Sequence, residues 1–282
     1  VPTQPAPKGV TITQYDKDGI EAIRLVKLDL LGNRNLSTVR CACDLVRRRT
    51  RREVDVESLP PADPATISLL QSARTVGCNQ LESPAMRRLL RMMRPGDVRD
   101  VMQALALIRP GAASIGMKEV FIRRHLGLEG PPPGDRRVEG ILRASGGVML
   151  YEDDVMLVAA AVTGCSLAEA DRLRKAIQRC PDDRRRVELS GQFLARCRAN
   201  GVDLEFAEDL WVQMAKFNAY SFCRAHAASY GLLAYAGAYL KAHHPLEFWV
   251  SALNNNQGMY HPRVYVEEAK RVVRDSLDLP PG

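Results

Sequence analysis

The sequence predicts a mainly helical protein that begins with a small β element. Ala, Leu and Arg are abundant, and aromatic residues make up only 6% of the 282 residues, a composition that favours helices over packed sheets. Apolar residues recur every three or four positions through most of the chain after Leu36, which is the spacing of a helix buried on one side. Strand-like patterns are concentrated in residues 1–32, with one further short apolar run at 147–152.

The charge balance points to an anionic partner. Forty Lys and Arg residues against 33 Asp and Glu give a formal net charge of +7 and a sequence pI near 9.1. Nucleic acid is the first candidate for such a partner and a membrane surface the second. The sequence has no phosphate-binding P-loop, no GxSxG, no HExxH and no dinucleotide fingerprint, so a P-loop NTPase is excluded.

Two further observations concern the compartment. No apolar run approaches the roughly 20 residues that a membrane-spanning helix needs, and the first residues lack the apolar core of a signal peptide. The seven cysteines are scattered singly, apart from Cys41 and Cys43, a pattern typical of reduced thiols rather than a disulfide framework. We therefore expect a cytoplasmic protein.

The first 32 residues predict the β element. Residues 1–10 are rich in proline and are expected to be irregular, 11–15 to form a strand and 16–22 a short helix or turn. A second strand is expected over 24–32. Because side chains alternate along a strand, this second strand would turn an apolar face toward a core and present Lys27 and Asp29 on its other face.

Asp29 is the first residue that could carry chemistry. Burying a carboxylate in an apolar strand costs several kcal/mol unless a partner compensates its charge. Asp29 is therefore either a ligand of a hard divalent cation or one half of a surface ion pair with Lys27. A site for two metal ions needs more than one carboxylate.

The rest of the chain predicts a succession of helices. One begins at Leu36, and a capping box of Ser166 and Glu169 is expected to open another. A flexible joint is expected at 127–135. The other helices are expected at 65–73, 82–93, 97–108, 152–164, 166–179, 184–200, 204–220, 229–244 and 262–275.

Two segments suggest binding. On the helix at 166–179, Arg172, Lys175 and Arg179 share one face, which is either a phosphate-binding surface or a solvated face with Glu169 and Asp171 as counterions. In the segment 217–231, aromatic residues surround Arg224 and His226. That segment is either a surface on which bases stack or a corner between two helices with an aromatic core and a hydrogen-bonded histidine.

Four segments in order resemble one family. Residues 13–32 (TQYDKDGIEAIRLVKLDLLG), 79–127 (NQLESPAMRRLLRMM to RRHLG), 146–177 (GGVMLYEDD to RLRKAI) and 216–256 (KFNAYSFCRAHAASYG to ALNNN) resemble the alpha subunit of bacterial DNA polymerase III, the C family of DNA polymerases. The resemblance covers nearly the whole chain. It implies that residues 1–32 are the C-terminal piece of a palm with a polymerase-beta-like nucleotidyltransferase fold, and that 33–282 form the helical fingers domain.

The resemblance also implies roles for single residues. Lys27 and Asp29 match the Lys-x-Asp strand of the palm, so Asp29 is expected to be catalytic and to help hold two Mg²⁺ ions. The two aspartates that complete this site lie upstream in the family and do not occur here, so we expect the isolated segment to be inactive. The residues expected to bind the incoming nucleotide are Lys27, Arg109 of the Arg-Pro-Gly element, Arg174 and Lys175 of the Leu-Arg-Arg helix, Arg224 and His226.

DNA contacts and partners follow from the same resemblance. Primer–template DNA is expected to meet the basic residues Arg47, Arg48, Arg49, Arg51 and Arg52 through its backbone, without sequence readout. The full-length protein is expected to work with a sliding clamp and other replisome subunits in DNA replication, and no membrane contact is expected. A non-catalytic helical nucleic-acid-binding module is the alternative; a structural scaffold would explain neither the basic excess nor the ordered motifs.

The sequence departs from the family pattern at four places. Asp153 and Asp154 stand where Gln or Glu is common, 177–179 (Ile-Gln-Arg) replaces Met-Gly-Lys, and Cys223 replaces a frequent Asn. Lys175 replaces the second Arg of the Leu-Arg-Arg helix, which keeps the charge but loses the planar fork. These differences suggest a divergent, error-prone paralogue.

Overall fold

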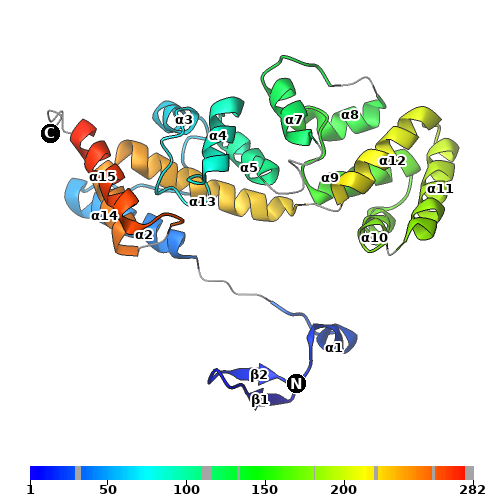
Figure 1. Ribbon diagram of the computed structural model, residues 1–282, viewed down its shortest axis with the longest axis horizontal. Helices are drawn as coiled ribbons and strands as arrows, with labels where there is room; N and C mark the ends of the chain where they lie inside the picture. The colour runs from blue at the N-terminus through cyan, green and yellow to red at the C-terminus, as the bar shows by residue number, and fades with distance from the viewer. Residues whose placement is uncertain are drawn as a thin grey trace. The chain divides into compact units, whose positions relative to one another are not determined.

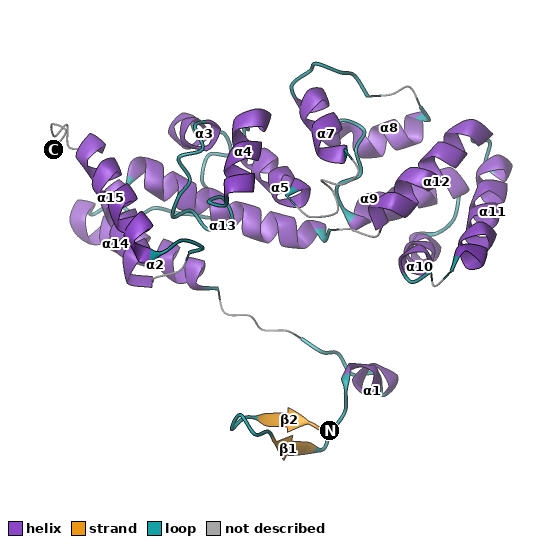
Figure 2. Cartoon of the chain, viewed as in Figure 1, coloured by secondary structure: helices purple, strands orange, loops and turns teal. Residues whose placement is uncertain are grey.

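Helices make up nearly all of the regular structure, as the composition predicts (Figure 1, Figure 2). The computed structural model describes residues 1–28, 33–108, 116–131, 134–180, 182–218, 222–255 and 258–276. The chain divides into two compact units, Val1–Arg34 and Asn35–Gly282. Each unit is considered by itself.

The first unit contains a short hairpin and one short helix. Strand β1 (Thr3–Pro5) pairs antiparallel with β2 (Thr11–Thr13), and Gly9 adopts a φ of +77° in the turn between them, a conformation that glycine reaches without strain. Helix α1 (Lys17–Ala22) follows. The expected strand at 11–15 and the short helix at 16–22 are confirmed in kind, whereas the prediction that 1–10 is irregular is wrong at β1.

The predicted second strand is wrong for its described part, residues 24–28. Arg24 adopts a left-handed φ of 61°, and Val26 and Leu28 are 80% and 78% exposed, so no apolar face is buried there. An extended segment becomes a strand only when a neighbour accepts and donates its backbone hydrogen bonds. In the described part of this unit, β1 and β2 pair with each other and offer no such neighbour to 24–28. Asp29 lies outside the described residues.

The second unit is built of helices alone among the residues described. Helix α13, at 20 residues, runs alongside α5 and α3 (Figure 1). The helices are α2 (Arg34–Thr50), α3 (Pro64–Gln71), α4 (Pro84–Met93), α5 (Val98–Leu107), α7 (Met117–His125), α8 (Arg136–Leu142), α9 (Glu152–Thr163), α10 (Leu167–Gln178), α11 (Asp183–Ala199), α12 (Leu204–Asn218), α13 (Arg224–His243), α14 (Pro245–Asn255) and α15 (Pro262–Ser276).

Side-chain caps fix where several helices begin. The Ser166 hydroxyl accepts from the Glu169 N–H, and the Glu169 carboxylate accepts from the Ser166 N–H at 3.0 Å, which confirms the predicted capping box. Asp97 and Asp100 form a second capping box at α5, and the Asp63 carboxylate caps α3 by accepting from the Thr66 N–H. Each such cap satisfies backbone donors that the first turn leaves without partners.

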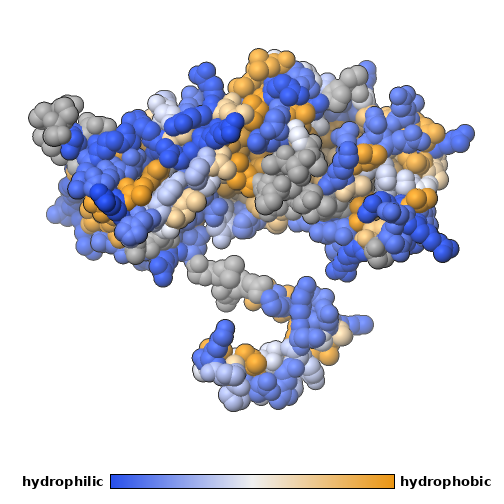
Figure 3. Space-filling model, viewed as in Figure 1, coloured by the Kyte–Doolittle hydropathy of each residue, from blue (hydrophilic) through white to orange (hydrophobic). Residues whose placement is uncertain are grey.

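Two hydrophobic cores hold the second unit together. The first core gathers residues of α2–α5, α7 and α13–α15, with Leu90 and Trp249 among its most buried side chains. The second core gathers residues of α8–α12, with Phe193 and Trp211 in contact at a ring-centroid distance of 5.4 Å. Figure 3 shows hydrophobic residues gathered over the middle of this unit and mainly hydrophilic ones over its ends.

The run at 147–152 joins the two cores and is not the predicted strand. It has no partner strand in the described structure. Val148, Leu150 and Tyr151 enter the first core, and Met149 enters the second. The run therefore distributes its apolar side chains between two groups of helices instead of pairing in a sheet.

None of the described helices is both long and apolar enough to cross a membrane.

Candidate functional site

The starts of α9 and α13 meet beside α10. The Glu152 N–H donates to the Phe222 carbonyl at 2.9 Å, which fixes the two helix starts side by side. Arg174 of α10 reaches the same place, with its Nη1 2.8 Å from Glu152 Oε2. The run at 147–152, the Leu-Arg-Arg helix and the described residues from Phe222 onward are therefore neighbours. We call this group the junction cluster: Tyr151, Glu152, Asp154, Asp171, Arg174, Lys175, Phe222, Arg224, His226 and Tyr230.

Arg174 is held between two carboxylates. Besides its bond to Glu152, its Nη2 and Nε donate to Asp171 Oδ1 at 2.9 and 3.1 Å, and its side chain is only 10% exposed. Charge-assisted hydrogen bonds of this kind are roughly twice as strong as neutral ones. They fix the guanidinium in one orientation at the base of the cluster.

Lys175 shares Asp171 but points outward. Its Nζ lies 2.7 Å from Asp171 Oδ2, and its side chain is 53% exposed. The hydrogen bonds from Lys175 and Arg174 hold the pKa of Asp171 below its usual range. Asp171 thus acts as the counterion that the solvated-face alternative predicts, whereas Glu169 pairs instead with Ser166 and, at 3.6 Å, with Arg196.

Arg224 is the cation of the cluster that no carboxylate neutralises within 4.0 Å in the described structure. It is the first residue of α13 and is exposed. Its Cζ lies 5.5 Å from the centroid of the Tyr151 ring, within the range of a cation–π contact. The positive end of the α13 dipole adds to its charge at this point, so the start of α13 can attract an anion.

Asp154 fixes the backbone just before α9 through two hydrogen bonds. One of its oxygens, Oδ2, accepts from the backbone N–H groups of Leu150 and Tyr151 at 2.8 and 2.9 Å. Burial raises the pKa of Asp154, although these hydrogen bonds and the nearby Arg224 act in the opposite direction. Burial likewise raises the pKa of Tyr151 to about 12, so the phenol stays neutral.

His226 lies exposed between two aromatic rings. Its ring centroid is 4.3 Å from that of Tyr230 and 5.3 Å from that of Phe222. Phe222 itself is buried, as is Phe217. The buried Phe217 and Phe222 fit the interpretation as a corner with an aromatic core, and the stacking of bases on this segment stays a prediction.

Three further site residues are predicted from the sequence: Lys27, Asp29 and Arg109. Asp29 and Arg109 lie outside the described residues, and Lys27 is an exposed residue of the first unit. In the described ranges, no three His, Cys, Asp or Glu side chains lie close enough together to hold a metal ion. The described residues thus do not form the expected Mg²⁺ site, and the prediction for Asp29 stays a prediction.

The five predicted DNA-binding arginines lie at the end of α2 and just beyond it. All five are exposed. Arg47 pairs with Asp44 at 3.1 Å, and Arg49 pairs with Glu247 of α14. No described carboxylate lies within 4.0 Å of the remaining three, Arg48, Arg51 and Arg52, which leaves them free to meet a phosphate backbone.

Sequence reasoning missed the roles of Tyr151 and Glu152. The helix expected at 152–164 matches α9, but the strand expected at 147–152 gives Tyr151 and Glu152 no part in a site. The available signal was the run of three acidic residues at 152–154, because acidic residues favour the first turn of a helix. No spacing rule could show that Arg174 reaches across 22 residues to Glu152.

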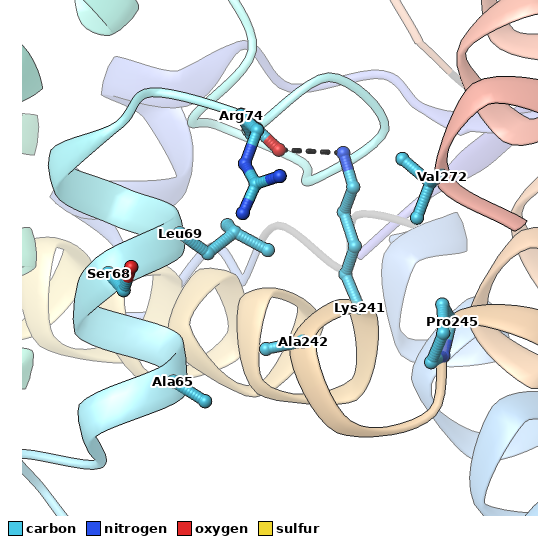
Figure 4. Close-up of a pocket in the computed structure, with 8 residues that line it drawn as sticks. All are labelled: Ala65, Ser68, Leu69, Arg74, Lys241, Ala242, Pro245 and Val272. Atoms are coloured by element: carbon cyan, nitrogen blue, oxygen red, sulfur yellow. Dashed lines mark hydrogen bonds between the residues drawn. The ribbon is translucent and has the colours of Figure 1, made fainter. Parts of the chain in front are cut away.

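A separate pocket of about 300 Å³ lies between α3 and α13, away from the junction cluster (Figure 4). The Arg74 side chain points into it, and Lys241 forms part of its wall. Lys241 Nζ donates to the carbonyls of Arg74 and Val76 at 2.7 Å each and lies 3.5 Å from Glu268. Because burial lowers the pKa of Lys241 and every nearby acceptor is a protein group, this lysine ties α13 to the loop after α3.

Comparison with known proteins identifies the family. Residues 35–201 match the family described as the bacterial DNA polymerase III alpha subunit finger domain, and the match begins at the first residue of the second unit. The chain is 35% identical over 255 residues to the DNA polymerase III subunit alpha of Pseudomonas aeruginosa (87% of this chain, 22% of that protein). It is 34% identical over 272 residues to the error-prone DNA polymerase 1 of Agrobacterium fabrum (96% and 25%).

A third relative extends the comparison. The DNA polymerase III subunit alpha of Aquifex aeolicus is 33% identical over 250 residues, 89% of this chain and 21% of that protein. The chain thus spans about a fifth to a quarter of the length of these relatives. Since the family match covers more than half of its residues, the chain belongs to the bacterial DNA polymerase III alpha subunit family and contains its helical finger domain.

Proposed function

We propose that the junction cluster binds the triphosphate of an incoming deoxynucleotide in a template-directed DNA polymerase that takes part in DNA replication. One observation carries the proposal: Arg174 of α10 binds Glu152 at the start of α9, and Glu152 is hydrogen-bonded to Phe222, just before Arg224 begins α13. Arg174 and its neighbour Lys175 are thereby brought to the region of Arg224. Phosphate oxygens accept hydrogen bonds from such groups, and a helix N-terminus favours their charge. The relatives' names as DNA polymerases support the same chemistry.

The three cations have different tasks in this proposal. Lys175 and Arg224 point outward and contact the phosphates. Arg174, clamped by Glu152 and Asp171, supplies charge at a fixed point, which stabilises a transition state without reorganisation. His226, which lies between two aromatic rings, contacts the nucleotide beside the phosphates, while Lys27 and Arg109 would add further positive charge.

The remaining expectations belong to the same proposal. Residues 1–32 are the C-terminal piece of the palm, 33–282 are the fingers, and Asp29 supplies one carboxylate to a Mg²⁺ site. The arginines after α2 contact the backbone of primer–template DNA. On this view the 282-residue chain alone does not extend a labelled primer, and measurable extension by the purified chain would contradict the proposal of an incomplete metal site.

The nucleotide site is tested by steady-state primer extension with the full-length protein. Lys175→Gln and Arg224→Gln should each raise the apparent KM for the deoxynucleotide about 10-fold or more, since a hydrogen bond to a charged group contributes about 1.5–3 kcal/mol. Arg185→Gln, which removes an exposed arginine from α11, is the matched control and should leave KM unchanged. Unchanged KM in both cluster variants would refute the proposal.

Asp29 and the error-prone role need separate measurements. Asp29→Ala should abolish turnover and leave DNA binding largely intact; near-normal turnover would remove Asp29 from the metal site. An error-prone enzyme should extend primers across an abasic site in the template. If the full-length protein stops there, that part of the proposal is wrong.

A further inference from the structure

Helix α4 carries a face made of arginines. It buries Met86, Leu89, Leu90 and Met93 in the first core. Its other side presents Arg87, Arg88 and Arg91, and Arg94 follows as the C-cap. At 3.6 residues per turn, three of these, at positions 87, 91 and 94, fall within about 60° of each other around the axis. The sequence of α4 contains no acidic residue.

These four arginines are not neutralised by the protein. In the described part of the chain, no carboxylate lies within 4.0 Å of any of them. Arg87 donates to the Ala73 carbonyl at 3.0 Å, which positions it without cancelling its charge. By contrast, Arg185 on α11 and Arg271 on α15 each pair with a glutamate on the same helix.

Arg94 extends the arginine face beyond the last residue of α4. It ends α4 in the left-handed conformation, with φ 52° and ψ 64°, and its N–H donates to the Leu90 carbonyl. Glycine is the residue that this position favours, because a side chain adds steric strain there. The chain keeps an arginine in a place where glycine would fit better and would carry no charge.

We propose that this arginine face is a DNA-backbone binding surface, additional to the arginines that follow α2. The inference rests on the proposed function, because it takes DNA as the ligand. Over seven residues the stripe spans roughly 10 Å along the helix axis, which matches a run of about three phosphates of one DNA strand. Long arginine side chains on such a stripe contact phosphates without reading bases.

A membrane surface fits this face less well. Helices that lie on bilayers expose Trp, Phe or Leu beside their basic residues. The apolar residues of α4 are buried, and Met92, at 39% exposure, is the one large hydrophobic side chain that it exposes. A phosphate polymer is therefore the better partner.

The test uses fluorescence anisotropy with a labelled primer–template duplex and the 282-residue chain, at several salt concentrations. Arg88→Gln/Arg91→Gln should weaken binding at least 10-fold at low salt. The double variant should also make the plot of log affinity against log salt concentration less steep, with a change in slope of about 2. Each phosphate that the protein no longer neutralises contributes about 0.9 to this change. The control Arg185→Gln/Arg186→Gln removes the same charge from arginines paired on α11 and should change affinity less than 3-fold.

A second pair of variants separates binding from folding. Arg94→Gly should keep or raise the melting temperature, since it relieves the left-handed strain, while weakening DNA binding. Gln80→Gly changes a residue with a similar φ of 66° but no charge, and should leave binding unchanged. If Arg94 acts through its charge, Arg94→Gly weakens DNA binding without lowering the melting temperature. If Arg94 is only structural, the substitution leaves DNA binding unchanged.

The outcomes distinguish this inference from the proposed function. Wild-type affinity in Arg88→Gln/Arg91→Gln and in Arg94→Gly would overturn the inference while leaving the nucleotide site intact. Binding of the chain to anionic phosphatidylserine vesicles but not to the duplex would also overturn it. In the full-length protein, the α4 variants should leave the apparent KM for the deoxynucleotide unchanged, because α4 contributes no residue to the junction cluster.

Discussion

At the scale of single residues, the buried charges of this domain are fixed by short-range partners. Glu82 accepts from the Gly77 and Met259 N–H groups and from the Tyr265 hydroxyl, all at 2.9–3.0 Å. Asp154 serves two backbone N–H groups at the start of α9. Buried charges persist where hydrogen bonds compensate for lost hydration, and both carboxylates hold loops that lead into helices.

Asp154 makes a prediction about pH. Since burial raises its pKa above 3.8, its contribution to stability is fully present below that pH and is lost as pH rises through the raised pKa. Asp154→Asn keeps the oxygen that accepts both hydrogen bonds but has no proton to lose. The variant should be more stable than the wild-type chain at pH 7, and the difference should shrink toward pH 4. Urea unfolding at the two pH values measures it, and a variant less stable at pH 7 would contradict the assignment.

At the scale of elements, close approach of α13 and α5 depends on a glycine. A Cβ at Gly231 would lie 2.6 Å from Met102 Cγ and 3.2 Å from Met102 Cα, whereas a Cβ at Gly237 would meet no atom within 4 Å. Both glycines are buried in the same helix. The first therefore sets the distance between two helices, and the second does not.

This contrast predicts opposite effects of the same substitution. Gly231→Ala should destabilise the fold by about 1–3 kcal/mol, because overpacking forces side chains or backbone to shift. Gly237→Ala should stabilise it by about 0.5–1 kcal/mol through the better helix propensity of alanine. Chemical denaturation of both variants tests the pair; equal effects would show that the α13–α5 contact yields easily.

The elements also show what could be predicted from the sequence. Helices with a capping residue and a clean apolar stripe, such as α4 after Ser83, lie close to where they were expected. Helices α7, α8 and α14 were missed, in the last case because Pro245 was interpreted as the end of a helix although it is the first residue of one, a position that proline favours. For the site, motifs indicate Arg174, Lys175 and Arg224, and helical spacing predicts Asp171 as a counterion. Only tertiary packing shows that Glu152 binds Arg174.

At the scale of the whole domain, the second unit contains two hydrophobic cores. The residues of the second core lie between the two main groups of first-core residues in the sequence. The second core takes its residues from 138–217, and the first core takes all of its residues except Val148, Leu150 and Tyr151 from the two sides of that range. Met117 packs against both cores, and the run 148–151 enters both. The first core is therefore complete only when α13–α15, which follow the second core in the sequence, pack against the helices that precede it.

Because the two cores are separate, a cavity made in one core should mainly destabilise the helices around that core. Phe193→Ala in the second core and Leu90→Ala in the first should cost about 3–5 and 2–5 kcal/mol, respectively. Amide hydrogen exchange should speed up mainly in α9–α12 for the first variant and mainly in α3–α5 and α13 for the second. Uniform acceleration across all helices in both variants would show that the two cores unfold as one.

The two cores can also be distinguished by tryptophan fluorescence. The chain has two tryptophans, and each core holds one: Trp249 in the first, 5.0 Å from the Lys241 ammonium, and Trp211 in the second, beside Phe193. In Trp211→Phe the remaining emission comes from the first core, and in Trp249→Phe from the second. The fingers therefore carry a native fluorophore in each half, and a conformational change on nucleotide or DNA binding can be assigned to one half without any added label.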